Sequence, residues 1–471
     1  MKKTITIIAL AALFVSCAKE AEQTPVTSGD VVTVAPTELR ATLETPEPDT
    51  KTTLGGTNGK QILWEEGDSI SVWPGVFAQA KYTLSSGEGT TSATFTLSSE
   101  PATGEQQGMF TIALYPYDAD VELGFNQTGR GLSLSNVKYP AVQNYRENSW
   151  DKGAMPMFGE LNDESNSLQL MNLAGVLRLT LKGTATIDSI RVSALGENEY
   201  IAGVILDPIS GEMFTSGKKT VTLKCGESGV ALSEATGTVF NIVIPPIAGG
   251  FEVTIYDNAH GFMELKSNSR IKRNTILNMP EKTYAPTAMD LGLSVYWATC
   301  NVGATTPEGY GDYFAWGETT AKETYDWNTY SLTSDGGTTF SRYNTTDGKT
   351  VLESDDDAAT AKWGAAWRMP TIAEFEELGA NCEWTWTTQN GVNGCKVTSK
   401  VEGYTDAAIF LPATGYRRGD SFRSVDSYGC YWSSSLYNTS RARNLNFNDS
   451  SADMSNHCSR YYGQSVRPVT E

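Results

Sequence analysis

The sequence predicts a mainly β protein, and three observations support that prediction. Short runs of alternating apolar and polar residues fill residues 38–283, and Gly, Pro, Asn or Asp separates one run from the next. The chain has 44 glycines and 10% aromatic residues, a composition typical of strands and turns. A clear helical pattern occurs only near residue 372. We therefore expect two β-sandwich domains followed by an irregular α+β domain.

The first 17 residues have the pattern of a lipoprotein signal peptide. Lys2 and Lys3 precede an apolar run over 4–15, and Cys17 follows Ser16. This run is too short to span a bilayer. We expect Cys17 to be the lipidated residue that anchors the protein in the membrane, with an ordinary cleaved secretory peptide as the alternative. Residues 18–37 are polar and unpatterned, as in a flexible tether.

Charge and histidine content exclude several classes of function. The chain has 36 basic and 55 acidic residues, a net charge of −19, which repels phosphate backbones and excludes nucleic acid as a partner. Its two histidines, His260 and His457, are too few for a histidine-rich metal site. The acidic run 355–357 lacks the alternating spacing of a calcium loop and is expected to be solvated. No cofactor and no metal are predicted.

Six cysteines follow Cys17, and an exported chain permits disulfides. Cys225 stands alone in the middle of the chain, and Cys300 lies in an apolar run that predicts a buried free thiol. The pairs to be expected first are the following: Cys382 with Cys395, and Cys430 with Cys458.

Two phrases in the first half of the chain are specific. Residues 62–73 read ILWEEGDSISVW and residues 271–279 read IKRNTILNM. Together with residues 51–54 and 114–117, they resemble fimbrillin-like proteins of the Bacteroidetes. The resemblance implies a lipid-anchored precursor with two β-sandwich modules, over 38–165 and 166–283.

Fimbrillin-like proteins include pilus stalk and tip subunits that polymerise by donating a strand to a neighbour. The resemblance therefore implies fimbrial subunits as partners. Arg40 is a candidate for trimming of the leading strand, although a surface arginine beside a strand is the simpler interpretation.

The only clear helix signal lies in the C-terminal part of the chain. Thr371 and Glu374 form a capping box, and Ile372, Phe375 and Leu378 fall on one helical face. We expect a short helix that ends at Gly379.

The phrases WGAAWRMPT (363–371), YWSSS (431–435) and GQSVRPV (463–469) are the most specific in the chain. With their neighbours they resemble the Fibrobacter succinogenes major paralogous domain over residues 286–471. That resemblance implies a relative of the C-type lectin-like fold. The paired motifs of calcium-dependent lectins are not evident. A core role is expected for the aromatic and basic residues of these phrases: Trp363, Trp367, Arg368, Trp432 and Arg467.

The last 61 residues have the composition of a binding surface. They contain seven arginines against five acidic residues, together with many Tyr, Ser and Asn, which are typical of adaptable binding sites. The tripeptide Arg418-Gly419-Asp420 is a second candidate recognition motif. The predicted ligand-binding residues are Tyr416, Arg417, Arg418, Tyr431, Arg441 and Arg443.

These observations predict an adhesin displayed on the outer membrane, at the cell surface, that binds glycans or host glycoproteins. A structural pilus tip or accessory subunit assembled by strand donation is the first alternative. An exported polysaccharide-acting enzyme is the second, although no pair of carboxylates stands out and no catalytic residue is predicted.

Overall fold

The computed structural model describes residues 36–44, 47–48, 63–73, 79–99, 112–125, 132–162, 165–204, 207–209 and 217–471. The predicted leader over 1–17 with Cys17, most of the tether over 18–37 and the phrase at 51–54 lie outside these residues. Among the helices described, none has the length and apolar character needed to cross a membrane.

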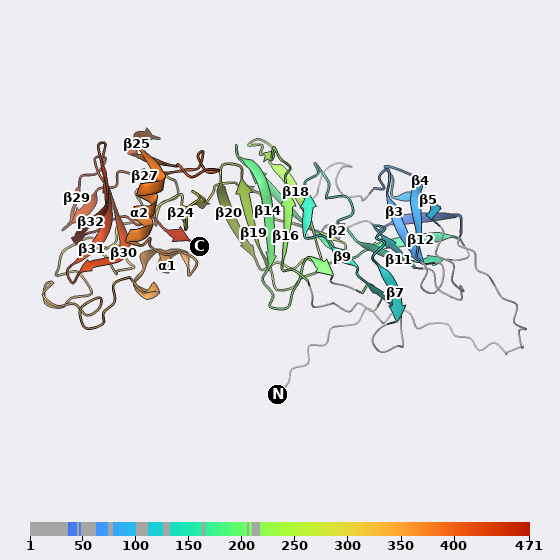
Figure 1. The fold of residues 1–471 in the computed structure, drawn as a ribbon, viewed down its shortest axis with the longest axis horizontal. Coiled ribbons are helices and arrows are strands. Elements are labelled where there is room, and N and C mark those ends of the chain that lie inside the picture. Colours follow the sequence, from blue (N-terminus) through green and yellow to red (C-terminus); the bar gives the residue numbers. More distant parts are fainter. Residues whose placement is uncertain are drawn as a thin grey trace, which may run out of the picture.

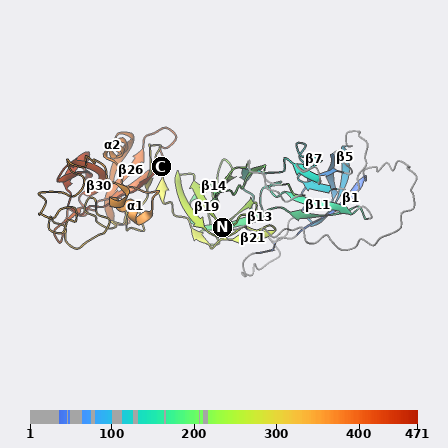
Figure 2. The same cartoon turned by 90° about the horizontal axis from the view of Figure 1, so that it is seen from below.

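The prediction of a mainly β fold is confirmed. The described residues form 33 strands and two α-helices. Figures 1 and 2 show these elements in a row of three parts, with β3, β4 and β5 at one end and β30, β31 and β32 at the other. The molecule is therefore elongated, and its C-terminal part is an end.

The first part is a seven-stranded sheet that closes on itself as a barrel, in the order β1-β12-β11-β6-β3-β4-β5. Closure occurs because β1 pairs with β5 on one side and with β12 on the other, a pairing that alternating runs alone do not reveal. The strands are β1 (Glu38–Leu43), β3 (Ser69–Trp73), β4 (Ala80–Ser86), β5 (Ser92–Ser99), β6 (Ile112–Tyr115), β11 (Met157–Asn162) and β12 (Ser167–Asn172). Two small strand pairs lie outside the barrel: β7 (Glu122–Phe125) with β8 (Leu132–Ser135), and β9 (Lys138–Tyr139) with β15 (Gly203–Val204).

The second part has two sheets packed around one apolar core, in which Leu179, Val192 and Val253 are buried. One sheet runs β18-β13-β21-β2, with β22 beside β13. Its strands are β2 (Glu47–Pro48), β13 (Gly175–Lys182), β18 (Thr238–Ile244), β21 (Thr275–Asn278) and β22 (Lys282–Thr283). The other runs β10-β16-β14-β19-β20, with β17 beside β14. Its strands are β10 (Val142–Asn144), β14 (Thr186–Ala194), β16 (Thr220–Lys224), β17 (Val230–Ala231), β19 (Phe251–Asp257) and β20 (Gly261–Ser267).

The second sheet does not stop at β20. It continues through three short strands that reach the C-terminus of the chain: β23 (Ala288–Met289), β24 (Tyr296–Ala298) and β33 (Val469–Thr470). Phe262 of β20 lies opposite Ala288, and Trp297 lies opposite Val469. Backbone hydrogen bonds therefore join the middle of the molecule to its C-terminal part.

The C-terminal part combines small sheets, long loops and two helices. Its sheets are β25 (Cys382–Gln389), β26 (Val392–Ser399) and β27 (Ala408–Pro412); β28 (Tyr416–Arg418) and β29 (Ser421–Arg423); and β30 (Gly429–Asn438), β31 (Arg441–Phe447) and β32 (Ala452–Ser459). Its helical segments are a 3-10 turn at Ser354–Asp356, α1 (Ala358–Trp363) and α2 (Ile372–Asn381).

The predicted helix is confirmed as α2, and its start has the predicted cause. Thr371 accepts a hydrogen bond from the Glu374 backbone, and the Glu374 side chain accepts one from the Thr371 backbone. The predicted end is wrong, because the helix continues past Gly379 to Asn381. Gly379 has another role: a Cβ there would lie 2.7 Å from Met454 Cγ, so glycine lets α2 approach β32 closely.

Both expected disulfides are wrong, since the six cysteines of the described residues are free thiols. Cys382 lies opposite Ser399 and Cys395 opposite Trp386, so the two are displaced by four residues, or about 13 Å, along their hairpin. Cys430 and Cys458 lie on β30 and β32, with β31 between them. Strands two apart are separated by about 10 Å, whereas the Cα atoms of a disulfide lie within about 7 Å.

Candidate functional site

Of the six predicted binding residues, four lie at the surface in two separate groups, and a fifth is buried. Arg441 and Arg443 lie on β31, while Tyr416 and Arg418 lie on β28. Tyr431 has no exposed surface, and its hydroxyl donates a hydrogen bond to the carbonyl of Pro412 at 2.7 Å. Its prediction as a ligand-binding residue is therefore wrong, because β30 is buried on both faces at this point.

The two β31 arginines form a compact group with two aromatic residues. Register places Arg443 opposite His457 of β32, and the rings of His457 and Tyr437 stack with centroids 3.8 Å apart at 14°. The Arg443 guanidinium lies 4.5 Å from the centre of the Tyr437 ring, within the range of a cation–π contact. Arg441 Nη1 lies 3.4 Å from His457 Nδ1. We call Tyr437, Arg441, Arg443 and His457 the outer-sheet patch.

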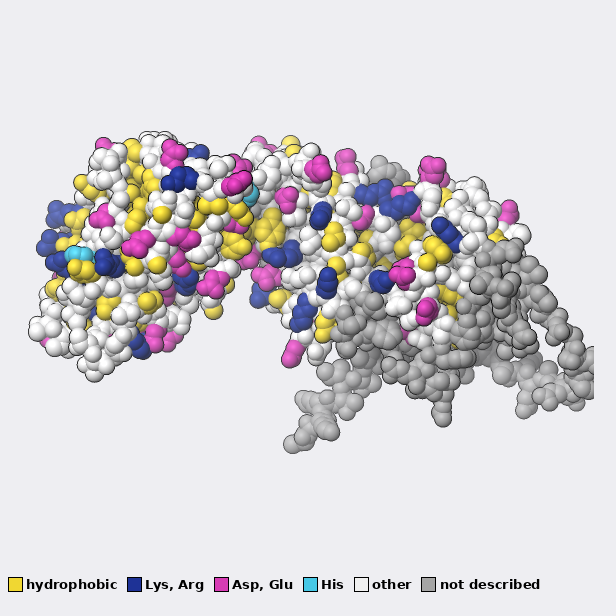
Figure 3. All heavy atoms as spheres, viewed as in Figure 1, with side chains coloured by type: hydrophobic (Ala, Val, Ile, Leu, Met, Phe, Trp, Pro, Cys, Tyr) yellow, Lys and Arg dark blue, Asp and Glu magenta, His cyan; other side chains and the backbone are white. Residues whose placement is uncertain are grey.

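The outer-sheet patch is accessible and positively charged. Tyr437 is 43% exposed, and among the described residues no carboxylate lies within 4 Å of either arginine. Figure 3 shows Lys and Arg side chains gathered around a histidine at the end of the molecule formed by the C-terminal part. An acidic protein thus presents a local cluster of unneutralised cations at one end.

The second surface group lies on the β28–β29 hairpin. The rings of Tyr416 and Tyr462 stack with centroids 5.3 Å apart, and the Arg418 guanidinium lies over the Tyr462 ring at 5.7 Å. Gly419, with φ +60°, lies in the turn of the hairpin, and Arg418 and Asp420 on either side of it are exposed. The Arg-Gly-Asp tripeptide is therefore accessible at a hairpin tip.

Arg417 joins this hairpin to the loop that carries Lys322 and Glu323. Its guanidinium donates hydrogen bonds to the carbonyls of Lys322 at 3.0 Å and Glu323 at 2.7 Å. It also lies over the ring of Phe422 at 4.8 Å. These contacts leave Arg417 a supporting role in the hairpin.

Two other arginines of the C-terminal part are fully buried. Arg467 donates hydrogen bonds to Asn301 Oδ1 and to the carbonyls of Ala298 and Phe410, each at 2.9 Å. Arg460 donates to the Tyr330 hydroxyl at 2.9 Å and lies 4.7 Å from the Phe340 ring centre. Burial lowers the pKa of both guanidinium groups. The core role predicted for Arg467 is confirmed.

The acidic run at 355–357 is not the solvated loop that its charge predicts. Asp356 and Asp357 are buried. Asp357 accepts hydrogen bonds from the backbone of Ala359 and Thr360 at the start of α1, and from Met369. Asp356 pairs with Arg342. No group of three or more His, Cys, Asp or Glu side chains suited to a metal is found in the part of the chain that the structure describes.

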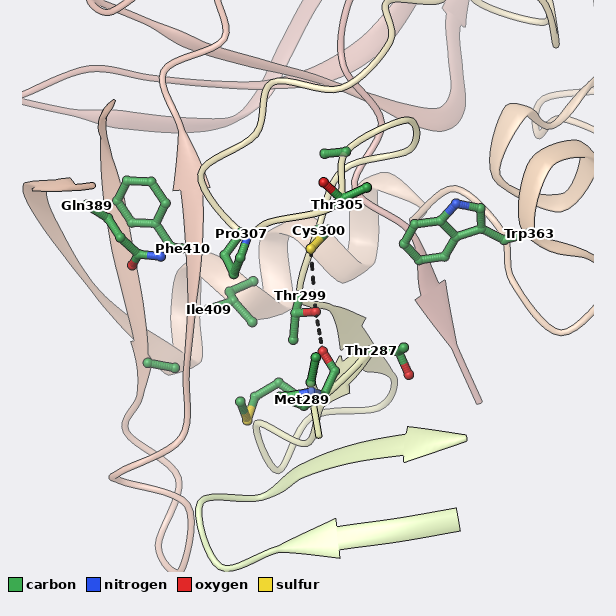
Figure 4. A pocket seen from close by; sticks show the side chains of 14 residues that line it. Thr287, Met289, Thr299, Cys300, Thr305, Pro307, Trp363, Gln389, Ile409 and Phe410 are labelled. Carbon is green, nitrogen blue, oxygen red and sulfur yellow. Dashed lines mark hydrogen bonds between the residues drawn. The ribbon is translucent and has the colours of Figure 1, made fainter. Parts of the chain in front are cut away.

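A cavity of about 460 Å³ lies beside the junction with the second part (Figure 4). Met289, Trp363, Ile409 and Phe410 supply most of its apolar wall, and the half-buried Cys300 thiol lies 3.8 Å from Thr299 Oγ1. None of the residues lining this cavity is Asp, Glu or His. The cavity therefore lacks the paired carboxylates of a glycosidase and a base for the thiol.

The buried thiols are also poor nucleophiles. Burial raises the pKa of Cys225 and of Cys395 to about 12 and that of Cys382 to about 11. A thiol with so high a pKa contains almost no thiolate near neutral pH. Cys458 packs with the inner cluster around Ala442, while His457 stacks outward on Tyr437. The two neighbours are thus directed to opposite faces of β32.

The sequence predicted Arg441 and Arg443 but not their aromatic partners. Tyr437 was one tyrosine among several, and His457 lies in another strand. The stack depends on the pairing of β31 with β32, and pairing register cannot be read from strand composition. The alternation of Arg441 and Arg443 was the one local signal that both point to the same face.

Known proteins resemble parts of this chain at low levels. The sequence model of a family described as Domain of unknown function (DUF8237) matches residues 385–469. None of the curated proteins matches. A solved structure of a candidate cell adhesion protein from Bacteroides ovatus has 11% identity and a TM-score of 0.31, covering 54% of this chain and 93% of that one. A fimbrial protein from Bacteroides ovatus has 10% identity and a TM-score of 0.22, covering 93% and 100%. The tip fimbrial protein Mfa3 from Porphyromonas gingivalis has 10% identity and a TM-score of 0.23, covering 49% and 81%.

Proposed function

We propose that this protein is a non-catalytic adhesin of the cell surface that binds its ligand through the outer-sheet patch. The observation that carries the proposal is the group of two unneutralised arginines around a half-exposed tyrosine, at one end of an elongated molecule. Exposed aromatic and arginine side chains are the residues that dominate binding energy at recognition surfaces.

The rest of the chain fits a supporting role. In this proposal, lipid on Cys17 anchors the protein in the outer membrane, and two fimbrillin-like modules, the barrel and the two-sheet part that follows it, form a stalk. A lectin-like head over 286–471 carries the patch away from the membrane. Glycans or host glycoproteins are the proposed ligands, and metal is not required.

The test is binding of the purified protein to an array of glycans and host glycoproteins, with calcium and with a chelator. We expect specific binding that chelation leaves unchanged and that Tyr437→Ala abolishes while the near-UV circular dichroism stays native. Phe422→Ala is the matched control, because it removes a ring of the β28–β29 hairpin that is 56% exposed and so more exposed than Tyr437. A silent array from folded protein would contradict the proposal.

A second function, assembly by strand donation, is favoured by the position of β1. This strand runs parallel to β12 and antiparallel to β5, and its inward residues Leu39, Ala41 and Leu43 are buried in the barrel. Cleavage after Arg40 would detach the first half of β1 (residues 38–40) and open a slot there that a strand from another subunit could fill. Arg40 is exposed on this strand.

This second function predicts cleavage after Arg40 by an arginine-specific protease, followed by ladders of detergent-resistant multimers on gels. Arg40→Gln should prevent both, whereas Arg423→Gln, at another exposed strand, should prevent neither. Absence of multimers after complete cleavage at Arg40 would exclude assembly by this route.

A further inference from the structure

The arginines of the outer-sheet patch retain most of their hydrogen-bonding capacity. A guanidinium has five N–H donors. Arg443 uses Nη1 to donate to the carbonyl of Ser455 at 2.7 Å, and Arg441 directs Nη1 at His457 Nδ1. Because a guanidinium cannot accept, Nδ1 is the acceptor in this contact. The remaining N–H groups of both arginines are available to an external acceptor.

The spacing of the arginines suits an anion of more than one oxygen. Residues two apart on a strand lie on the same face at about 7 Å, so both forks can reach one substituted ring. Arginine binds carboxylates and sulfate-like groups through two parallel hydrogen bonds. With no acidic partner within 4 Å among the described residues, the charge of the patch is not already neutralised.

The surroundings of the patch suit a sugar. Tyr437 is 43% exposed, but His457 stacks on its ring and the Arg443 guanidinium lies over it, so a ligand can contact the exposed edge of this ring. The neighbouring side chains at the same end of the sheet are short and polar: Asn438, Thr439, Ser440, Ser455 and Ser459. Hydroxyl and amide groups complement the hydroxyls that a sugar presents around its ring.

We infer that the outer-sheet patch binds an anionic sugar, one that carries a carboxylate or a sulfate ester on its ring. This inference rests on the proposed function and deepens it by naming the class of ligand. Arg441 and Arg443 hold the anionic group, and Tyr437 supports Arg443 through the cation–π contact and meets the sugar with its exposed edge.

The test uses matched glycans that differ only in charge: a neutral oligosaccharide, the same chain ending in a carboxylated sugar, and the same chain bearing a sulfate. Dissociation constants are measured by calorimetry or biolayer interferometry with the purified protein. We expect the anionic forms to bind at least tenfold more tightly than the neutral one. We also expect affinity to fall as sodium chloride is raised, since salt screens exposed charges. The carboxylated and sulfated arms identify which anion is preferred.

Variants distinguish binding at the outer-sheet patch from nonspecific attraction by positive charge. Arg441→Gln and Arg443→Gln should each weaken binding about tenfold, and Arg443→Lys should restore only part of it, because lysine keeps the charge without the planar fork. Arg423→Gln removes an equal charge from an exposed position outside the patch and should change affinity less than twofold.

Three results would overturn this inference, and a fourth would overturn the proposed function with it. Equal affinity for neutral and anionic glycans, with Tyr437→Ala still abolishing binding, would leave the adhesin proposal standing and remove the charge requirement. An equally large loss of affinity in Arg423→Gln would show that the glycan is attracted by positive charge in general and not by the outer-sheet patch. Equal binding of a Glu-rich peptide of the same charge would assign the patch to acidic peptides. If folded protein binds no glycan or glycoprotein at all, both proposals fail together.

Discussion

The arginines of the C-terminal part show that one residue type serves opposite purposes within 30 residues. Arg460 and Arg467 are fully buried and satisfied by carbonyl, amide and hydroxyl oxygens, so removing either would leave several polar groups unpaired. Arg441 is exposed. Composition counts both kinds equally. The phrase around Arg467 predicts its core role, but no local signal distinguishes the buried Arg460 from the exposed arginines.

Arg368 and Glu374 provide a residue-scale prediction. Burial acts to raise the pKa of Glu374, but hydrogen bonds from Arg368 and Thr371 and the Arg368 charge lower it overall. A lowered pKa in the folded state means that the ionised carboxylate stabilises the fold above its ordinary pKa, and that this contribution is lost as pH falls through the lowered value. Glu374→Gln can keep the cap but loses the ion pair. We expect it to cost about 1–2 kcal/mol at pH 7.

The measurement is urea unfolding followed by tryptophan fluorescence, which reports mainly the C-terminal part because eight of the eleven tryptophans lie there. The difference between wild type and Glu374→Gln should shrink below about pH 4. Glu376→Gln, at an exposed position of the same helix, should have little effect at either pH. A difference that persists unchanged at pH 3 would show that the charge is not its cause.

At the scale of elements, local signals predicted the structure where one residue or its near neighbours decide it. The capping box at Thr371 predicted the start of α2, and period-two runs predicted strands such as β13 and β19. Signals that depend on distant partners were missed. Gly379 was read as a helix end because its packing against Met454 of β32 is not visible in the sequence. Likewise the prediction of Tyr431 as a surface residue is wrong because β30 is covered on both faces, and no local signal shows that covering.

The contact of α2 with β32 gives the prediction at this scale. Gly379→Leu introduces a side chain whose Cβ would lie 2.7 Å from Met454 Cγ and 2.9 Å from Met454 Cε. We expect a loss of about 1–3 kcal/mol in the free energy of unfolding, the usual cost of overpacking. Ala380→Leu adds a side chain at the next, exposed position and should cost less than about 0.5 kcal/mol. Equal unfolding midpoints for the two variants would show that α2 does not depend on the small residue.

At the scale of the whole molecule, the proposed function depends on how firmly the outer-sheet patch is held at the far end. The second and C-terminal parts share a sheet through β20, β23 and β24, and an apolar cluster covers the junction. In this cluster Phe262 and Trp367 are buried with Ala288 and Ala298, and the rings of Phe262 and Tyr296 meet edge to face at 5.3 Å. Because the sheet is continuous across the junction, it restrains the orientation of the C-terminal part relative to the second part more than a linker would.

Phe262→Ala tests whether that cluster makes the two parts one mechanical unit. Loss of a buried phenylalanine costs about 3–5 kcal/mol. Here the loss falls on the junction, because the Phe262 side chain packs with Ala288 and Ala298 of the two short strands. We expect hydrogen exchange at the amides of β23 and β24 to quicken by tenfold or more while β13 and β31 keep their protection, since short strands open locally once their packing is removed. Phe95→Ala, which removes an equally buried ring from the barrel core, should leave exchange at β23 and β24 unchanged. If Phe262→Ala also leaves these amides protected, backbone pairing alone holds the junction. If Phe95→Ala exposes them, the three parts unfold together, and the position of the outer-sheet patch depends on the stability of the whole chain.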